Sequence, residues 1–378
     1  MTTTLELLDR LVAFDTVSHR SNLALIDHVQ DFLAARGFAV TRVRDPEAPK
    51  AGLFARIGPG EGGVLLSAHS DVVPVEGQAW TRDPFRLGVE GDRLYGRGTT
   101  DMKGALAAML ALADAAAKRP LRAPLKLAIS YDEEVGCVGI ARMIDALVPA
   151  IGLPRACIVA EPTGLAVATG HKGKQVLRAV CHGEAGHSAL APRFVNALHL
   201  ATDLVQRLRA LQDELAATGA RDEAYAIPFS TVHVGTLTGG RALNIVPDRA
   251  EIAFEVRHVA AEDPAGLVAR IRTAAAGIAA AHGPPGRIEI ETPNAYPGLD
   301  TAPEAEVVRM TRALAGAAST TRVAFGTEAG FFHRLGIPTV VCGPGSMEAE
   351  GHRPDESISR RELAAFDAML SRLLDRLC

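Results

Sequence analysis

The sequence predicts an α/β protein with a central, mostly parallel sheet and a smaller α+β domain inserted into it. In the first third of the chain, short apolar runs alternate with helical patterns, which is typical of a sheet covered by helices on both faces. In the middle, the order becomes strand–helix–strand–strand–helix–strand, which is typical of a small domain with one antiparallel sheet. We therefore expect one domain from residues 1–172 and 294–378, interrupted by a ferredoxin-like domain at residues 173–293.

Hydrophobic spacing indicates the elements of the first domain. Two N-terminal helices carry apolar residues at helical spacing, and the second stops at Gly37. Their apolar positions are Leu5, Leu8, Leu11 and Val12, then Leu25, Val29, Phe32 and Leu33. Short apolar runs predict strands at residues 52–57, 64–66, 125–129 and 157–159, with a long helix at 102–118. Polar candidates follow several of these strands, where the chemistry of open α/β sheets is usually found.

The inserted domain is indicated by half-exposed strand patterns and two long helical patterns. The strands are expected at residues 174–182, 230–236, 251–257 and 287–291, and the helices at 195–215 and 264–281. Such alternation of apolar and polar residues is typical of an antiparallel sheet with one solvated face.

Composition excludes several classes of protein. Of the 378 residues, 48% are hydrophobic and 22% are charged, which argues for a packed core and against disorder. The net charge of -4, with both signs mixed, argues against a nucleic-acid binder. We find no signal-peptide pattern, no apolar run long enough for a bilayer, and an odd number of cysteines without a CxxC pair. We therefore expect a reduced, cytoplasmic protein that binds neither nucleic acid nor membranes.

Five short segments carry side chains suited to metal binding, and most place them near Gly or Pro. Together they supply nitrogen and oxygen donors and a carboxylate that two metals could share, so they predict a two-metal site. The candidate residues are His69 with Asp71, Asp101, Glu133 with Glu134, Glu161, and His352. Adjacent residues of an extended chain point to opposite sides, so Glu134 would bind a metal while Glu133 faces the substrate and moves a proton.

Each segment also has an ordinary interpretation when it is taken alone. A His-x-Asp pair such as His69 and Asp71 is more often simple hydrogen bonding, and an Asp before a helix is a common N-cap, which would account for Asp101. The two adjacent glutamates could form a solvated acidic loop, and Glu161 and His352 could be loop residues without a role. The combination of all five segments favours the metal site.

These segments, in this order, resemble those of the dinuclear zinc amidohydrolases and exopeptidases. This family includes acetylornithine deacetylase, succinyl-diaminopimelate desuccinylase, aminoacylase and carboxypeptidase G, and the resemblance covers essentially the whole chain. Three stretches resemble the acetylornithine deacetylase branch, namely residues 130–137, 325–330 and 341–346. The resemblance implies a zinc-exopeptidase-like catalytic domain, with the inserted domain as a lid and dimerisation domain, and hence a homodimer.

The resemblance also implies a ligand set for two zinc ions, with cobalt able to substitute. His69, Asp101 and Glu161 would bind one ion. Glu134 and His352 would bind the other, with Asp101 bridging the two ions. All these positions are filled by residues of the expected type, which argues against a protein that merely keeps the scaffold without catalysis.

The remaining site residues are expected to act on the substrate. Glu133 would be the general base and acid, and Asp71 would orient a metal ligand without binding a metal itself. His187 would polarise the scissile carbonyl, either in its own subunit's site or in the partner's. Two further residues, Asn244 and Arg257, match positions that contact a substrate carboxylate in the family.

The expected reaction is hydrolysis of the N-acetyl amide of N2-acetyl-L-ornithine to acetate and L-ornithine, a step of arginine biosynthesis. We expect the carboxylate of Glu328 to bind the ornithine amino group. The same scaffold handles succinyl, acetyl and glutamyl substrates, so a desuccinylase or a broad N-acyl-amino-acid deacylase remains the alternative.

Overall fold

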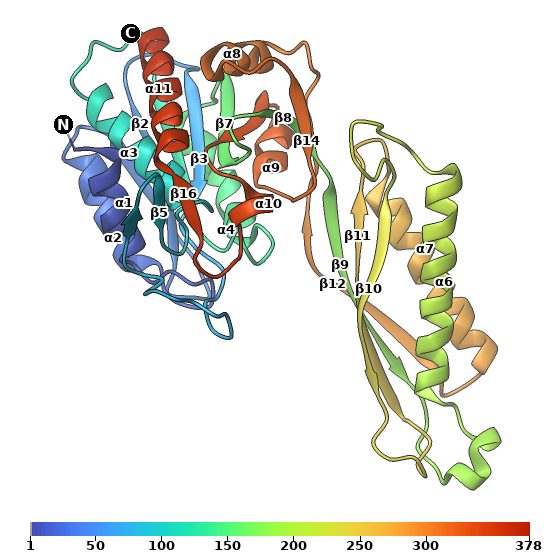
Figure 1. The fold of residues 1–378 in the computed structure, drawn as a ribbon. Helices are drawn as coiled ribbons and strands as arrows, with labels where there is room; N and C mark the ends of the chain where they lie inside the picture. Colours follow the sequence, from blue (N-terminus) through green and yellow to red (C-terminus); the bar gives the residue numbers. More distant parts are fainter. Residues whose placement is uncertain (1) are drawn as a thin grey trace. The chain divides into compact units, whose positions relative to one another are not determined.

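The chain folds into two separately packed units in the computed structural model, which describes residues 2–378. The first unit contains the chain up to His171 and the segment Leu299–Cys378, and the second contains Lys172–Gly298 (Figure 1). The inserted unit ends at Gly298, a few residues beyond the expected residue 293, because its last strand continues to Tyr296.

The first unit is built on a nine-stranded sheet of order β1-β2-β6-β3-β7-β15-β8-β13, with β14 paired to β8. The neighbours β6, β3, β7 and β15 run parallel, while the pairs at the β1 edge are antiparallel. The strands are β1 (Ala39–Arg44), β2 (Ala51–Ile57), β3 (Val64–His69), β6 (Leu125–Ser130), β7 (Ala156–Pro162), β8 (Val167–His171), β13 (Leu299–Asp300), β14 (Thr320–Val323) and β15 (Thr339–Gly343). The central, mostly parallel sheet predicted from the sequence is therefore confirmed.

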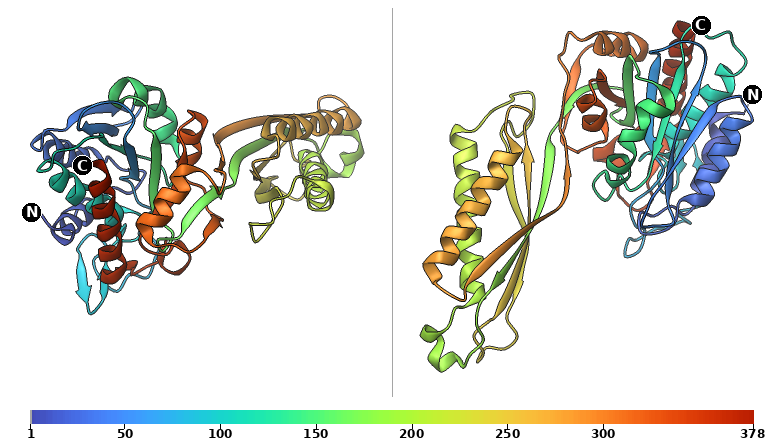
Figure 2. Two further views of the ribbon diagram at one scale, coloured as in Figure 1. Left: turned by 90° about the horizontal axis from the view of Figure 1, so that it is seen from above. Right: turned by 180° about the vertical axis from the view of Figure 1, so that it is seen from behind.

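Helices cover both faces of this sheet (Figures 1 and 2). Helices α1, α2, α3, α8 and α11 share one hydrophobic cluster with one face, whereas α4 lies on the other face, where Met143 fills the space above Gly52. The helices are α1 (Thr4–Val12), α2 (Leu23–Ala34), α3 (Lys103–Ala116), α4 (Val138–Met143), α5 (Leu147–Ile151), α8 (Glu306–Ala315), α9 (Ala329–Arg334), α10 (Met347–Glu350) and α11 (Arg360–Leu377), with a 3-10 turn at Ile144–Ala146. Every residue of β3, β6 and β7 is buried, as a sheet covered on both faces requires.

A small three-stranded sheet joins two distant segments of the first unit. It has the order β16-β5-β4, with β4 at Gly88–Glu90, β5 at Arg93–Tyr95 and β16 at Ser357–Ser359. Because Ser357 pairs with Tyr95, the C-terminal segment lies beside the chain that leads to Asp101. This sheet therefore brings two predicted ligand segments, around Asp101 and His352, to the same place.

The second unit is an antiparallel four-stranded sheet with two helices on one face. The strand order β10-β11-β9-β12 is that of a ferredoxin-like domain, and the sequence predicted it. Its elements are β9 (Gly173–His182), a 3-10 turn (Ser188–Arg193), α6 (Ala197–Thr218), β10 (Thr231–Gly239), β11 (Arg249–His258), α7 (Pro264–His282) and β12 (Arg287–Tyr296). Leu177, Ala179 and Cys181 lie at alternate positions of β9 and pack in the hydrophobic cluster that includes the two helices.

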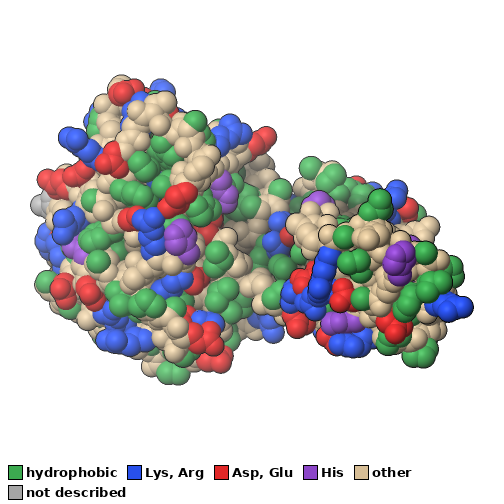
Figure 3. Space-filling view, turned by 90° about the horizontal axis from the view of Figure 1, so that it is seen from below, with side chains coloured by type: hydrophobic (Ala, Val, Ile, Leu, Met, Phe, Trp, Pro, Cys, Tyr) green, Lys and Arg blue, Asp and Glu red, His purple; other side chains and the backbone are tan. Residues whose placement is uncertain are grey.

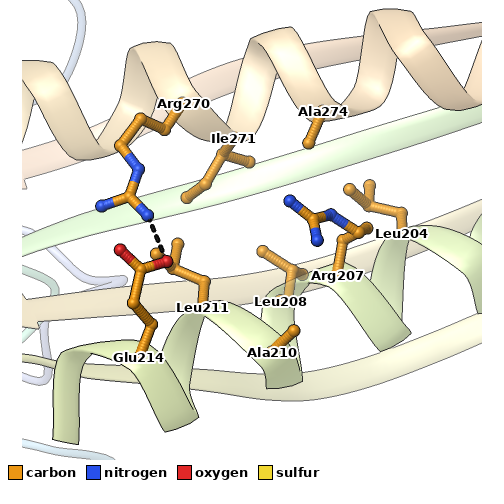
Figure 4. Close-up of a pocket in the computed structure, with 9 residues that line it drawn as sticks. All are labelled: Leu204, Arg207, Leu208, Ala210, Leu211, Glu214, Arg270, Ile271 and Ala274. Carbon is orange, nitrogen blue, oxygen red and sulfur yellow. Dashed lines mark hydrogen bonds and ion pairs between the residues drawn. The ribbon is translucent and has the colours of Figure 1, made fainter. Parts of the chain in front are cut away.

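The two helices of this unit meet along a shallow groove with a cavity of about 60 Å³ (Figure 4). Leu208, Leu211 and Ile271 line it, and Arg270 donates to Glu214 across it at 2.6 Å. Side chains of both charge signs are interspersed on the surface seen in Figure 3, as the composition leads one to expect. Of the helices within residues 2–378, none is long and apolar enough to cross a membrane.

Candidate metal centre

The predicted ligands lie at the carboxyl ends of neighbouring parallel strands. His69 is the last residue of β3, Glu161 lies near the end of β7, and Glu133 and Glu134 follow β6 after a short turn. Because β6, β3 and β7 are adjacent and parallel, these ends meet at one edge of the sheet. The strands therefore bring together side chains that are far apart in sequence.

His69 is held in one orientation by the backbone. Its Nδ1 donates to the carbonyl oxygen of Asp71 at 2.9 Å, so Nε2 is the ring atom that faces the carboxylates. The Nε2 atom lies 3.0 Å from Asp101 Oδ1 and 3.7 Å from Glu161 Oε1. The imidazole is 1% exposed, and this arrangement of a backbone acceptor behind the ring is common in metal-binding histidines.

The carboxylate of Asp101 lies between two histidines. Its Oδ1 faces His69, and its Oδ2 lies 3.1 Å from Nε2 of His352. Burial opposes its ionisation, but the hydrogen bonds from His352 and His69 prevail and hold the pKa of Asp101 well below its usual range. The N-cap of α3 is Met102 and no side chain caps the helix, so the capping interpretation of Asp101 is wrong.

His352 also faces Glu134, with 3.0 Å between Nε2 and Oε2. The hydrogen bonds to Asp101 and then Glu134 raise the pKa of His352 to about 10. Burial raises the pKa of Glu134 to about 7, and its Oε1 has no hydrogen-bond partner among the described residues. Buried carboxylate oxygens are normally satisfied, so this oxygen is a suitable donor for a metal ion.

Burial is the main cause that raises the pKa of both Glu133 and Glu161 well above the usual range, and neighbouring carboxylates add to it. Two groups of candidate ligand atoms are compact, since the atoms within each group all lie within 4.8 Å of one another. One group is His69, Glu133 and Glu161, and the other is His69, Asp101 and Glu134. Cys137 Sγ donates to Glu133 Oε1 at 3.3 Å, and its own raised pKa keeps it a thiol. Glu133 thus lies among the ligand candidates with one carboxylate oxygen held.

Four carboxylates and two imidazoles therefore meet in a largely buried space. Within residues 2–378, no Lys or Arg forms an ion pair with the carboxylates of Asp101, Glu133, Glu134 or Glu161. Uncompensated buried negative charge is costly, and nitrogen and oxygen donors of this kind suit divalent cations. The donor set and its charge fit a pair of metal ions.

Asp71 supports the turn that carries the two glutamates. Its carboxylate accepts from the backbone N–H groups of Glu133 at 3.1 Å and Glu134 at 3.3 Å, and from the hydroxyl of Ser18 at 2.7 Å. The carboxylate lies 3.6 Å from Nδ1 of His69, farther than the carbonyl oxygen of the same residue. Asp71 therefore fixes the backbone of Glu133 and of Glu134 at once.

Glu328, at the start of α9, is enclosed next to the site. It is 1% exposed, and its Oε2 accepts from the hydroxyl of Ser67 at 3.3 Å, while Oε1 has no hydrogen-bond partner in the described chain. Burial raises the pKa of Glu328 to about 7. A substrate amino group would have to enter this enclosed position to bind the carboxylate.

Three predicted residues belong to the second unit. His187 precedes the 3-10 turn, and its exposed ring accepts from the backbone N–H of Ala189. Asn244 is exposed as well, and its backbone carbonyl accepts from the backbone N–H of Ser188 at 3.1 Å. Arg257 lies near the far end of β11, where it donates to Glu255 at 2.8 Å. His187 and Asn244 are thus brought together, and Arg257 is separated from them.

The sequence did not point to the side chains that hold the ligand loops. Arg97 and Glu356 form a buried ion pair at 2.7 Å, although 259 positions separate them. Ser18 and Gln78 also bond to ligand-bearing segments. The only signals were an Arg beside glycines in the segment before Asp101 and a Glu shortly after His352, and neither has a recognisable spacing.

Comparison with known proteins agrees with this geometry. The model of peptidase family M20/M25/M40 matches residues 65–376. The acetylornithine deacetylase of Myxococcus xanthus is 35% identical over 380 residues, which cover 98% of this chain and 96% of the relative. That of Klebsiella pneumoniae (strain 342) is 32% identical, with 95% and 92% covered. The M20 family metallo-carboxypeptidase Sso-CP2 from Sulfolobus solfataricus superposes with a TM-score of 0.80 at 20% identity, with 99% of each chain covered.

The chain therefore belongs to peptidase family M20/M25/M40 and is a metallohydrolase. This confirms the resemblance drawn from the sequence. The family implies a dinuclear metal site, and the buried clusters around His69 and Asp101 supply suitable donors.

Replacing Glu328 by Gln tests the protonation of the enclosed carboxyl group. Because its pKa is raised to about 7, the folded protein keeps a proton that the unfolded chain releases near its ordinary value of 4.5. That stabilisation is complete at low pH and is lost as the pH rises through about 7. Gln stays neutral, so the unfolding free energy of E328Q relative to the wild type should rise by about 3 kcal/mol between about pH 4 and about pH 8. Urea unfolding of the metal-free proteins measures it, and a difference independent of pH would contradict it.

Proposed function

We propose that this protein hydrolyses the N-acetyl amide of N2-acetyl-L-ornithine to acetate and L-ornithine, as in arginine biosynthesis. The observation that carries the proposal is the set of imidazole and carboxylate donors around Asp101 in a chain that aligns over nearly its full length with acetylornithine deacetylases. Zinc is the proposed metal, with cobalt as a substitute, because tetrahedral to five-coordinate nitrogen and oxygen sites suit zinc.

We propose the following division of ligands. His69 and Glu161 would hold one ion, Glu134 and His352 would hold the other, and Asp101 would be shared by both. The distances of 3.0 Å and 3.1 Å from the two Asp101 oxygens to the two imidazoles support its place as the bridge. When bound, the ions would polarise the scissile carbonyl and lower the pKa of the attacking water.

Glu133 is the proposed proton carrier. It takes the proton from water as the oxygen bonds to the amide carbon, and it delivers the proton to the leaving nitrogen as the carbon–nitrogen bond breaks. Two contacts prepare it for this role: Cys137 holds one carboxylate oxygen, and Asp71 holds its backbone N–H. Its backbone neighbour Glu134 remains directed toward His352.

His187 is the proposed donor to the carbonyl oxygen, where negative charge develops in the transition state. Asn244 and Arg257 are the proposed contacts of the substrate carboxylate. His187 forms an antiparallel β-bridge with Ile245, which lies just before β11 begins at Arg249. Arg257 lies near the other end of β11. A strand of this length spans about 30 Å. One small substrate cannot touch both ends, so contact with both requires two subunits.

This separation supports a homodimer in which the inserted unit of one subunit completes the site of the other. It also supports the proposed roles of that unit as a lid and a dimerisation domain. Exposed apolar side chains on the loops around His187 fit such a use: Leu190 and Ile245 are 45% and 42% exposed, and Leu243 is fully exposed. Large exposed apolar groups that gather at one place often mark an interaction site.

A substrate panel tests the proposed function. We expect the purified protein, stripped of metal and then reloaded with zinc or cobalt, to hydrolyse N-acetyl-L-ornithine in preference to N-succinyl-diaminopimelate and other N-acetyl amino acids. Initial rates at matched substrate concentrations measure this preference. Metal-dependent activity that is highest on another amide would keep the assignment as a metallohydrolase and change only the assigned substrate. Absence of activity on every member of the panel, with two metals bound, would reject the reaction.

Replacing Glu133 by Gln should lower kcat by about 10²–10⁴-fold, because the amide cannot carry the proton. The metal content should stay at the wild-type level, since Glu133 is not a proposed ligand. Glu306→Gln, at an exposed glutamate, is the matched control and should leave kcat unchanged. Elemental analysis together with steady-state kinetics distinguishes the roles. Loss of metal in E133Q would make Glu133 a ligand, and wild-type turnover would remove it from the mechanism.

Mixing two inactive variants tests the shared site. H187A lacks the carbonyl donor and E133Q lacks the base, so each homodimer should be nearly inactive. In a random mixture, about half of the dimers carry one of each subunit, and each such dimer keeps one intact site. We expect activity to recover to about a quarter of the wild-type level after subunit exchange. No recovery, with exchange verified by differently tagged subunits, would place His187 in its own subunit's site.

A further inference from the structure

One fully buried ion pair joins the two ligand loops of the candidate metal centre. The guanidinium of Arg97 and the carboxylate of Glu356 are 0% and 1% exposed, and Nη1 donates to Oε2 at 2.7 Å. Burying two charges carries a large desolvation cost that their attraction offsets only in part, so an apolar pair could stabilise the fold equally well. What the pair contacts besides itself indicates what it does.

Glu356 organises the backbone that leads into Asp101. Its Oε1 accepts from the N–H groups of Thr100 at 2.8 Å and Asp101 at 3.0 Å. Its Oε2 accepts from the N–H of Gly98 at 3.0 Å, in addition to the bond from Arg97. Three N–H groups of one turn therefore converge on a single carboxylate. The backbone of Asp101 cannot shift without breaking a charge-assisted hydrogen bond, which is among the stronger kinds.

The guanidinium of Arg97 also contacts the loop that carries His352. Its Nη1 also donates to the carbonyl of Arg353 at 3.3 Å, and its Nη2 donates to Gln78 Oε1. The side-chain amide of Gln78 in turn donates to the carbonyl of His352 at 3.0 Å. The segment after His352 is thereby fastened to the same guanidinium that binds Glu356.

The consequence is a fixed distance between two side chains that lie 251 positions apart. His352 Nε2 meets Asp101 Oδ2 at 3.1 Å, and neither loop is regular secondary structure at this point. His352 has a φ of 61°, in the left-handed region that non-glycine residues rarely occupy, so surrounding contacts must hold its conformation. Arg97, Gln78 and Glu356 supply those contacts.

We propose that Arg97 and Glu356 are positioning residues that set the metal affinity of the position formed by Asp101, Glu134 and His352. The proposal rests on the two-metal site described above. The pair orients two of the three ligands of that position, but only Asp101 of the position that contains His69 and Glu161. Its loss should therefore weaken one metal position much more than the other.

Cobalt titration of the metal-free full-length protein tests this selectivity, because binding is read from absorbance and not from turnover. We expect wild type to bind two Co²⁺ ions. Glu356→Gln keeps an acceptor for Thr100 and Asp101 but places an NH₂ group against Arg97 or Gly98. It should weaken the second Co²⁺ by about 10–100-fold, the usual effect of losing a group that orients a ligand, and leave the first within a few-fold. Arg97→Lys keeps the charge, loses the fork and should act in the same direction.

A double-mutant cycle with His352→Ala identifies the affected position. If Glu356 acts through Asp101 and His352, then E356Q should weaken Co²⁺ binding little further in the H352A background, because that position is already lost. An equal effect in both backgrounds would overturn the proposal. So would wild-type dissociation constants for both ions in E356Q and R97K.

Matched controls separate positioning from general stability. Arg36→Lys alters a different, mostly buried ion pair, between Arg36 and Asp114 at 2.7 Å, which does not touch either ligand loop. It should leave both Co²⁺ constants unchanged, and a loss equal to that of R97K would overturn the proposal. If E356Q does not fold, Gln78→Ala replaces it, since it removes the bonds of Gln78 to Arg97, Trp80 and His352 but leaves the Arg97–Glu356 pair in place. A few-fold loss at the second ion is expected, and no change would overturn the proposal. Wild type that binds no Co²⁺ would reject the metal assignment itself.

Discussion

The concentration of buried negative charge at one edge of the sheet is the constraint on which the structure of the first unit depends. Asp101, Glu133, Glu134 and Glu161 face one another and two imidazoles, and no Lys or Arg within residues 2–378 pairs with them. Such a group cannot form from flexible loops, because repulsion would spread the carboxylates apart. It needs a scaffold stable enough to hold them, and the buried parallel strands β6, β3 and β7 supply it.

The scaffold acts through a layer of residues that never face the substrate. Asp71 holds the backbone of both glutamates, the carbonyl of the same residue orients His69, and Glu356 collects the N–H groups before Asp101. Each of these contacts uses a backbone group, which has fewer ways to move than a side chain. The geometry of the centre therefore depends on the path of the backbone. Placing the same ligand side chains on another fold would not reproduce it.

The sequence was sufficient to predict most of the fold, because apolar runs and helical spacing report local burial. It also placed His69, Glu133, Glu134 and Glu161 near strand ends, where topology makes them neighbours. Taken alone, the segment around Asp101 indicated a helix cap, because capping and metal binding both use a carboxylate just before a helix, and only the combination of segments favoured metal binding. The sequence could not find Arg97 and Glu356 as partners, because 259 positions separate them and a single ion pair leaves no periodic pattern.

The point at which the second unit leaves and rejoins the first has a consequence for how the chain folds. Leu299 pairs directly with His171 across β13 and β8, so the long insertion begins and ends at adjacent residues of one sheet. Once the inserted unit has folded, its two ends are already close together, and the first unit pays little extra entropy to close over it. The insertion is topologically a hairpin loop, so a change in its length or surface would leave the register between β8 and β13 in place.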